Sequence, residues 1–234
     1  DIKKKYKIEY ELSDILEDLI CTRIMYPSSK LSSYEDSKKF LRQPKYEIYD
    51  VYRALDIIAK EKENIEKWCY EKSANLIKTR NTKVLYYDCT NYFFEVEMED
   101  NDDLENNKKG LRKYGASKEN RPLPIVEMGL FIDGTGFPLA FNIHPGNTNE
   151  QTTLRPLEKQ IMKDFQLSKF LICTDAGLGS FNNRIFNTKG DRIYIVTQSL
   201  KQLSAEYQAD ALSPMGWHLL GSNKSVNINE INKY

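Results

Sequence analysis

The chain has 234 residues, 40% of them hydrophobic, with 34 basic and 34 acidic side chains and a formal net charge of zero. Aromatic and β-branched residues recur throughout, which argues against a disordered chain and favours a globular protein. The balanced charge removes the usual evidence for nucleic-acid binding, a basic surface, so any DNA contact must be argued from local charge. No apolar run approaches the roughly 20 residues of a membrane-spanning helix, so we expect no membrane partner.

The cysteines indicate the redox environment. Cys21, Cys69, Cys89 and Cys173 form no CxxC pair, which argues against a zinc site. Widely spaced cysteines in apolar stretches are typical of buried, reduced thiols. We therefore expect a cytoplasmic protein.

Residues 1–80 are expected to form a helical region for packing or DNA binding. Leucine and isoleucine recur at helical spacing between Leu12 and Ile24. The segment Ser32–Glu35 has a capping-box pattern and predicts the start of a short helix. Two further apolar stripes run over 48–58 and 65–76. Such stripes more often form a core than a site, so we favour packing.

Residues 81–200 carry a strand-rich pattern. Strands are predicted at 84–90, 125–132, 137–143, 170–175 and 193–197, with helices at 153–165 and up to about residue 186. Three strands followed by alternating helices and strands predict an α/β (α+β) fold, a mixed five-stranded sheet with helices on its faces. The first strand shows no alternation, which predicts burial on both faces. A charged loop at 95–123, acidic then basic, separates the first two strands, and charge runs of this kind are usually solvated.

Two aspartates stand out against these strands. Asp88 lies in the first strand, and Asp175 ends the fourth. Carboxylates that converge at a sheet edge repel each other, and Mg²⁺ or Mn²⁺ relieves this repulsion. Two such ions about 4 Å apart can activate an attacking oxygen and stabilise a leaving oxygen at phosphorus. Asp175 could equally cap the next helix, and the pattern alone does not separate these roles.

Two other polar residues are weaker candidates. Asp133 precedes Gly134 and is expected to form a hairpin turn. His144, in the segment His-Pro-Gly-Asn, is expected in a surface turn after the third strand. His144 could also lie near the metals, but we favour the surface turn.

Several blocks, in order along the chain, resemble the IS4-type DDE transposases and especially their IS1634 branch. Residues 86–95 resemble the first catalytic block, and residues 174–178 resemble the second. Residues 110–122 resemble the family's Gly-x-Ser-Lys-Glu-x-Arg-Pro stretch, and residues 145–150 read Pro-Gly-Asn-Thr-Asn-Glu as in the family. The likeness covers nearly the whole chain, and the order and spacing of the blocks are more specific than any one of them.

This resemblance implies an RNase H-like catalytic core behind a helical region. It implies the transposase of a bacterial insertion sequence, acting on transposon ends and target DNA in the nucleoid by strand cleavage and 3′-OH strand transfer. Asp88 and Asp175 would be catalytic and bind Mg²⁺, or Mn²⁺, in a two-metal site. A homodimer is the further partner that the resemblance suggests. The basic half of the charged loop would contact phosphates through Lys118 and Arg121, with Arg112 and Lys113.

The third carboxylate of the family is missing from the sequence. In the family it is a glutamate in a Tyr-x2-Arg-x3-Glu-x6-Lys block, and this chain has no such block. We expect residues 201–234 to begin a truncated insertion region and the isolated chain to be catalytically incomplete. The alternatives are a non-catalytic remnant that binds DNA or full-length transposase, and a hydrolase of small phosphate esters. The sequence does not give the end sequence, target preference, excision route or oligomeric state.

Overall fold

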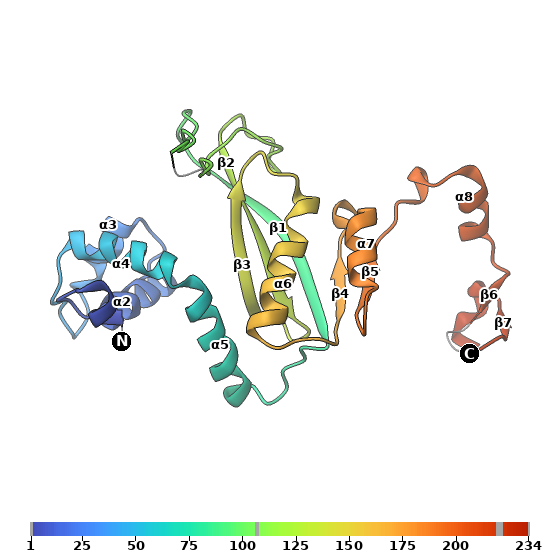
Figure 1. Ribbon diagram of the computed structural model, residues 1–234, viewed down its shortest axis with the longest axis horizontal. Coiled ribbons are helices and arrows are strands. Elements are labelled where there is room, and N and C mark those ends of the chain that lie inside the picture. Colours follow the sequence, from blue (N-terminus) through green and yellow to red (C-terminus); the bar gives the residue numbers. More distant parts are fainter. Residues whose placement is uncertain (1, 106–107, 219–221, 234) are drawn as a thin grey trace. The chain divides into compact units, whose positions relative to one another are not determined.

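The chain forms two compact units, Asp1–Lys78 and Thr79–Tyr234. The computed structural model describes residues 2–105, 108–218 and 222–233 (Figure 1). Each unit is described on its own below.

The first unit is helical. Its helices are α1 (Ile2–Tyr6), α2 (Leu12–Met25), α3 (Lys30–Ser37), α4 (Ile48–Lys60) and α5 (Lys62–Leu76). The predicted start of the short helix at Ser32 was wrong, because α3 begins at Lys30. The side chain of Ser29 accepts a hydrogen bond from the Ser32 amide at 3.2 Å, so the cap lies three residues earlier than the capping-box pattern indicated.

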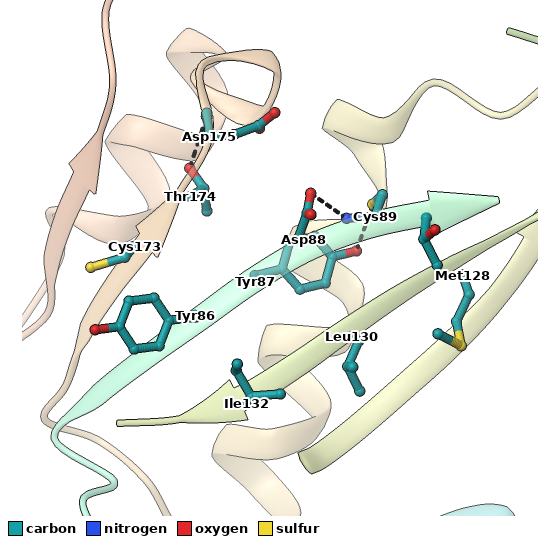
Figure 2. A pocket seen from close by; sticks show the side chains of 11 residues that line it. Tyr86, Tyr87, Asp88, Cys89, Met128, Leu130, Ile132, Cys173, Thr174 and Asp175 are labelled. Atoms are coloured by element: carbon teal, nitrogen blue, oxygen red, sulfur yellow. Dashed lines mark hydrogen bonds between the residues drawn. The ribbon is translucent and has the colours of Figure 1, made fainter. Parts of the chain in front are cut away.

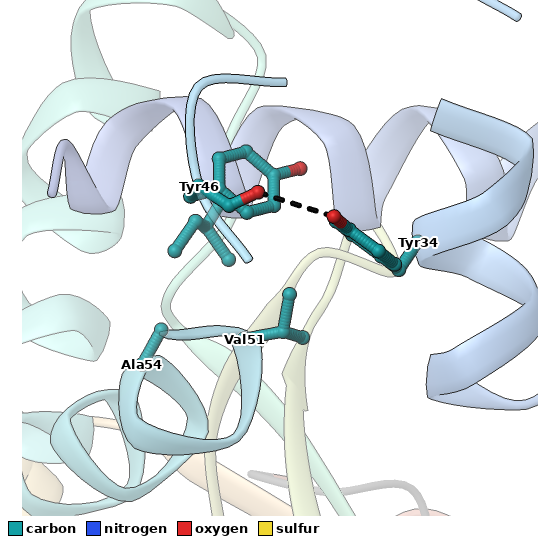
Figure 3. Close-up of a cluster of buried hydrophobic side chains, with 5 residues drawn as sticks. Tyr34, Tyr46, Val51 and Ala54 are labelled. Atoms are coloured by element: carbon teal, nitrogen blue, oxygen red, sulfur yellow. Dashed lines mark hydrogen bonds between the residues drawn. The ribbon is translucent and has the colours of Figure 1, made fainter. Parts of the chain in front are cut away.

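The core of this unit joins α2, α3 and α4. Its buried members are Ile15, Tyr34, Tyr46, Val51 and Ala54 (Figure 3). Tyr34 donates a hydrogen bond to the carbonyl of Tyr46 at 3.3 Å, and Tyr46 donates one to the buried carboxylate of Asp18 at 2.6 Å. The apolar stripes of α2 and α4 therefore build a core, as their spacing indicated.

The second unit contains a mixed five-stranded sheet. Its strands are β1 (Val84–Phe93), β2 (Ile125–Asp133), β3 (Pro138–Pro145), β4 (Leu171–Thr174) and β5 (Ile193–Val196), in the order β3-β2-β1-β4-β5. The pairs β1–β2 and β2–β3 are antiparallel, and the pairs β1–β4 and β4–β5 are parallel. This is the RNase H-like arrangement, so the expected fold class is confirmed. The hairpin turn at Asp133 is also confirmed, because Asp133 accepts hydrogen bonds from the amides of Thr135 and Phe137.

The helices of the sheet are α6 (Leu154–Asp164) and α7 (Phe181–Asn187), with the short 3₁₀ helices η1 (Glu150–Thr152) and η2 (Ala176–Leu178). Helix α6 contacts β3 and α7, and α7 contacts β5 (Figure 1). A buried ion pair ties this layer together, with Arg192 donating to Glu158 of α6 at 3.1 Å and to the carbonyl of Phe186 at 2.6 Å.

Only one face of β1 is buried, so the prediction of burial on both faces was wrong. Leu85, Tyr87 and Cys89 are at most 2% exposed, whereas Tyr86 is 45% exposed and lies on the opposite face together with Asp88. The buried face is the one under α6, where Tyr87 hydrogen bonds to Thr153 at 2.6 Å. Within the described residues, α6 and α7 lie together and leave the Tyr86 side of the sheet open.

The elements after β5 are short. They are η3 (Leu200–Gln202), α8 (Ala205–Leu212), β6 (Trp217–His218), β7 (Ser225–Val226) and η4 (Ile228–Lys233). No helix in the described ranges is both long enough and apolar enough to cross a membrane.

Candidate active site

The parallel pair β1–β4 carries Asp88 and Asp175 to the same edge of the sheet. Tyr86 pairs with Cys173 in the parallel ladder. Asp88 follows Tyr86 by two residues, and Asp175 follows Cys173 by two residues. Side chains two residues apart share a face of a strand, and parallel strands end at the same edge. The two aspartates are therefore neighbours: Asp175 directly follows the carboxyl end of β4, and Asp88 lies beside that end, in the middle of β1.

Both aspartates line one pocket of about 400 Å³ on the open face of the sheet. Its other lining residues are Tyr86, Tyr87, Cys89, Thr90, Met128, Leu130, Ile132, Cys173 and Thr174. Figure 2 shows the two carboxylates at the same end of this pocket, with Tyr86 and Ile132 toward the other end. The pocket thus combines an apolar floor with a carboxylate rim.

Asp88 is accessible to solvent, contrary to the expectation that its strand would bury it. Its side chain is 74% exposed, because the Asp88 side of β1 carries no covering helix in the described residues. Its Oδ1 accepts a hydrogen bond from the Cys89 amide at 2.8 Å. An exposed carboxylate does not need a metal for its own solvation, so burial cannot be the argument for metal binding here.

Asp175 has the capping role that the sequence left open. It is the N-cap of η2, and its Oδ1 accepts a hydrogen bond from the Leu178 amide at 3.2 Å. This bond fixes the orientation of the carboxylate at the rim of the pocket. A capping carboxylate can also bind a cation, so the two roles are compatible.

Lys118 is a basic residue that lies beside Asp88. Its ammonium donates to the carbonyl of Cys89, and it lies 4.0 Å from Asp88 Oδ1 and 3.8 Å from Glu150 Oε1. A single cation therefore stands between carboxylates of β1 and η1. This residue was predicted to contact phosphates, and its position brings it to the candidate site.

The other predicted phosphate-binding residues are paired within the charged segment. Arg112 donates to Asp100 at 2.7 Å, and Lys113 lies 2.9 Å from Asp102. Arg121 donates to Glu119 at 2.8 Å and stacks on the ring of Phe93 at 4.2 Å. The acidic half of the segment thus neutralises much of the basic half. Among the described contacts, Lys118 is the one of these four residues that pairs with an aspartate of the pocket.

Two glutamates near this site were missed by the sequence analysis. Glu127 of β2 is only 4% exposed, and burial together with the neighbouring Glu150 raises its pKa to about 7, which Lys118 partly opposes. A charged residue inside the apolar run Ile125-Val126-Glu127-Met128 was the available signal. Glu150 follows the Pro-Gly-Asn turn and was treated only as part of a family block.

His144 does not lie in a surface turn. It belongs to β3, opposite Glu127, and burial lowers its pKa. The strand continues past the predicted end at 143 because Pro145 still pairs with Val126 of β2. His144 therefore shares the buried face of the sheet with Glu127.

The donors present suit a hard cation bound by few protein ligands. In the part of the chain that the structure describes, no three His, Cys, Asp or Glu side chains are close enough together to hold a metal ion. The four cysteines are free, and three of them are only partly buried, contrary to expectation. Two aspartates with water and a substrate phosphate match the coordination that Mg²⁺ adopts in phosphoryl-transfer sites.

No protein-family model matches the sequence, and no curated protein matches it. Among solved structures, the chain is similar to a piggyBac transposase synaptic complex with hairpin DNA, with 14% identity over 86% of this chain and 46% of that one and a TM-score of 0.43. It is also similar to a Mos1 transposase paired-end complex with the left transposon end, with 11% identity over 80% of this chain and 58% of that one and a TM-score of 0.31. A Mos1 mariner paired-end complex with Mn gives 12% identity, coverage of 80% and 59%, and a TM-score of 0.32. The chain thus spans about half the length of these transposases, and similarities at this level concern the fold alone.

Proposed function

We propose that this chain is part of a DDE-type DNA transposase of the IS4 type, in its IS1634 branch. The observation that carries the proposal is the meeting of Asp88 and Asp175 in one pocket, on adjacent parallel strands and beside the carboxyl end of β4. The ordered sequence blocks add the choice of family. The substrate is duplex DNA at the ends of a bacterial insertion sequence.

Asp88 and Asp175 would hold the divalent cations. When bound, Mg²⁺ or Mn²⁺ activates the attacking oxygen and stabilises the leaving oxygen at phosphorus. The protein groups orient this chemistry. Asp175 is held by its bond to the Leu178 amide, and Lys118 supplies a positive charge within reach of both Asp88 and an incoming phosphate.

We further infer that the isolated chain binds DNA and metal without robust cleavage. The sequence has no Tyr-x2-Arg-x3-Glu-x6-Lys block to supply the family's third carboxylate. A site with two carboxylates binds a cation more weakly than one with three, because each carboxylate contributes charge and an oxygen ligand. The same observation favours the second candidate function, a non-catalytic module that pairs with DNA or with full-length transposase.

The test combines metal and DNA binding on matched variants. Asp88→Asn and Asp175→Asn each remove one charge with little change in shape, and Asp191→Asn is the control because Asp191 is 72% exposed and lies outside the pocket. We expect each site variant to lose the Mn²⁺ bound in the Asp88–Asp175 pocket, seen as a lower number of bound ions by electron paramagnetic resonance, and the control to keep it. We also expect Mn²⁺ to tighten binding of transposon-end duplex by wild type and not by either site variant.

The outcomes separate the two functions. Metal-stimulated DNA binding that depends on both aspartates supports the transposase site. DNA binding that is indifferent to metal and to both variants supports the non-catalytic module. Strong Mg²⁺-dependent cleavage by the purified chain would contradict the inferred incompleteness.

A further inference from the structure

A row of polar side chains crosses three strands on the buried face of the sheet. Asn91 of β1 pairs with Glu127 of β2, and Glu127 pairs with His144 of β3. Residues directly opposite each other in antiparallel strands place their side chains on one face, about 5 Å apart. Asn91 Nδ2, Glu127 Oε2 and His144 Nε2 are all buried and, among the described residues, have no hydrogen-bond partner.

Three unsatisfied polar atoms in one row call for a bound species. A buried polar group without a partner is destabilising by about 1–3 kcal/mol, and such groups in folded proteins usually contact water or an ion. Glu127 opens into a second cavity of about 410 Å³, which Glu150 also lines. A cavity of this size holds several waters, so a hydrated ligand fits and a single bare ion does not fill it.

The charge in this cavity favours a cation over water alone. The carboxyl groups of Glu127 and Glu150 line the same cavity, and Glu150 together with burial raises the pKa of Glu127. Two carboxylates so placed are unfavourable unless a proton or a cation lies between them. Lys118 is 3.8 Å from Glu150, but it is shared with Asp88 and with the Cys89 carbonyl. One ammonium group therefore serves two carboxylates and a backbone carbonyl.

We propose that Glu127 and Glu150 form a second divalent-cation site, which takes a hydrated Mg²⁺ or Mn²⁺ and is separate from the Asp88–Asp175 pocket. A hydrated Mg²⁺ needs only one or two carboxylates, since it keeps several of its waters. The absence of a third acidic or histidine ligand in the described residues is consistent with this kind of coordination.

The second site adjoins the first one without sharing its ligands. Gly177 lines the Glu127–Glu150 cavity, and a Cβ at Gly177 would lie 3.5 Å from both carboxylate oxygens of Asp175. The buried amide of Asn183 ties η1 to η2 by donating to the carbonyls of Gln151 and Leu178 at 3.0 and 2.9 Å. These bonds connect the segments that carry Glu150 and Asp175, so an ion at the second site would add positive charge beside the Asp88–Asp175 pocket.

The experiment counts Mn²⁺ ions by electron paramagnetic resonance in a background that lacks the first site. In the full chain carrying Asp88→Asn and Asp175→Asn, we expect one Mn²⁺ ion to remain bound. Adding Glu127→Gln is expected to weaken the binding of this ion at least tenfold, and adding Glu150→Gln is expected to do the same. Glu119→Gln is the matched control, because Glu119 is paired with Arg121 outside the cavity.

Thermal unfolding checks that each variant folds. Glu127→Gln is chosen because it keeps the shape of the side chain. We expect Mn²⁺ to raise the melting temperature of the Asp88→Asn/Asp175→Asn protein. We expect no such rise once Glu127→Gln is added. No bound Mn²⁺ in the background, or an ion that survives Glu127→Gln in a folded protein, overturns the proposal. Since the first site is removed beforehand, this result does not depend on whether the proposed transposase function is correct.

Discussion

Replacement of Lys118 by glutamine tests how the ammonium group competes with a metal ion. At 4.0 Å from Asp88 Oδ1, the attraction between unit charges is about 1 kcal/mol in water and about 4 kcal/mol at an effective dielectric constant of 20. Asp88 is 74% exposed and Lys118 is 46% exposed, so the value near that of water applies. A divalent cation at Asp88 must displace or tolerate this ammonium group. Its removal should therefore tighten Mn²⁺ binding by about 1 kcal/mol, which is roughly fivefold.

The assay is Mn²⁺ titration at low ionic strength, with Lys113→Gln as the control because Lys113 pairs with Asp102. DNA binding should change in the opposite direction. Loss of one phosphate-contacting cation weakens duplex binding and lowers the salt dependence of the binding constant by about one unit on logarithmic axes. Unchanged or weaker Mn²⁺ binding in folded Lys118→Gln protein would refute this reasoning, since it would mean that no metal binds where the ammonium group lies.

Three further predictions concern stability. Asp175→Ala should destabilise the protein by about 0.5–1 kcal/mol, whereas Asp175→Asn, which can still accept from the Leu178 amide, should not; equal chemical-denaturation midpoints for the two variants would refute the capping role. Arg192→Met leaves Glu158 buried without its partner and should lower the free energy of unfolding by about 3 kcal/mol in urea titrations, and a loss below about 1 kcal/mol would contradict this. In metal-free buffer, the raised pKa of Glu127 predicts that wild-type stability falls as the pH rises from about 4.5 through about 7, because the folded state binds the proton more tightly. Glu127→Gln removes this loss and should be about 1–3 kcal/mol more stable than wild type at pH 8 and no more stable at pH 4, so a constant difference would count against the raised pKa.

The strands of the sheet could be predicted from the sequence because their apolar runs are bounded by turn residues. The hairpin at Asp133 is a local signal, since its carboxylate accepts from the amides of Thr135 and Phe137. The order of the strands followed from the sequence of elements and from the family blocks. The placement of Asp88 beside Asp175 depends on the parallel register of β1 and β4, in which Tyr86 pairs with Cys173.

The errors came from features that depend on packing between distant segments. The apolar β1 run was expected to be covered on both faces, but α6 and α7 lie together and bury only the Tyr87 side. Residue 144 was assigned to a turn because His-Pro-Gly-Asn is a turn pattern, yet β2 extends the pairing of β3 through Pro145. The approach of Glu127 to Glu150 joins a strand to a 3₁₀ helix, and no local pattern reports such a contact.

The pairing of charges in the segment 95–123 was also beyond local reasoning. Opposite charges about ten residues apart could form a solvated loop or fold back on each other, and the structure has them fold back through Asp100 and Arg112. That pairing leaves Lys118 as the basic residue at the candidate site. The sequence alone ranked it with three other basic residues.

The most direct test of the central claim is anomalous diffraction from crystals of this chain soaked in Mn²⁺. The account predicts an anomalous peak in the pocket between β1 and the carboxyl end of β4, with carboxylate oxygens of both Asp88 and Asp175 about 2.1 Å away. A well-ordered pocket without such a peak, or aspartates that turn away from each other when Mn²⁺ is present, would contradict the assignment of this site as the catalytic metal centre.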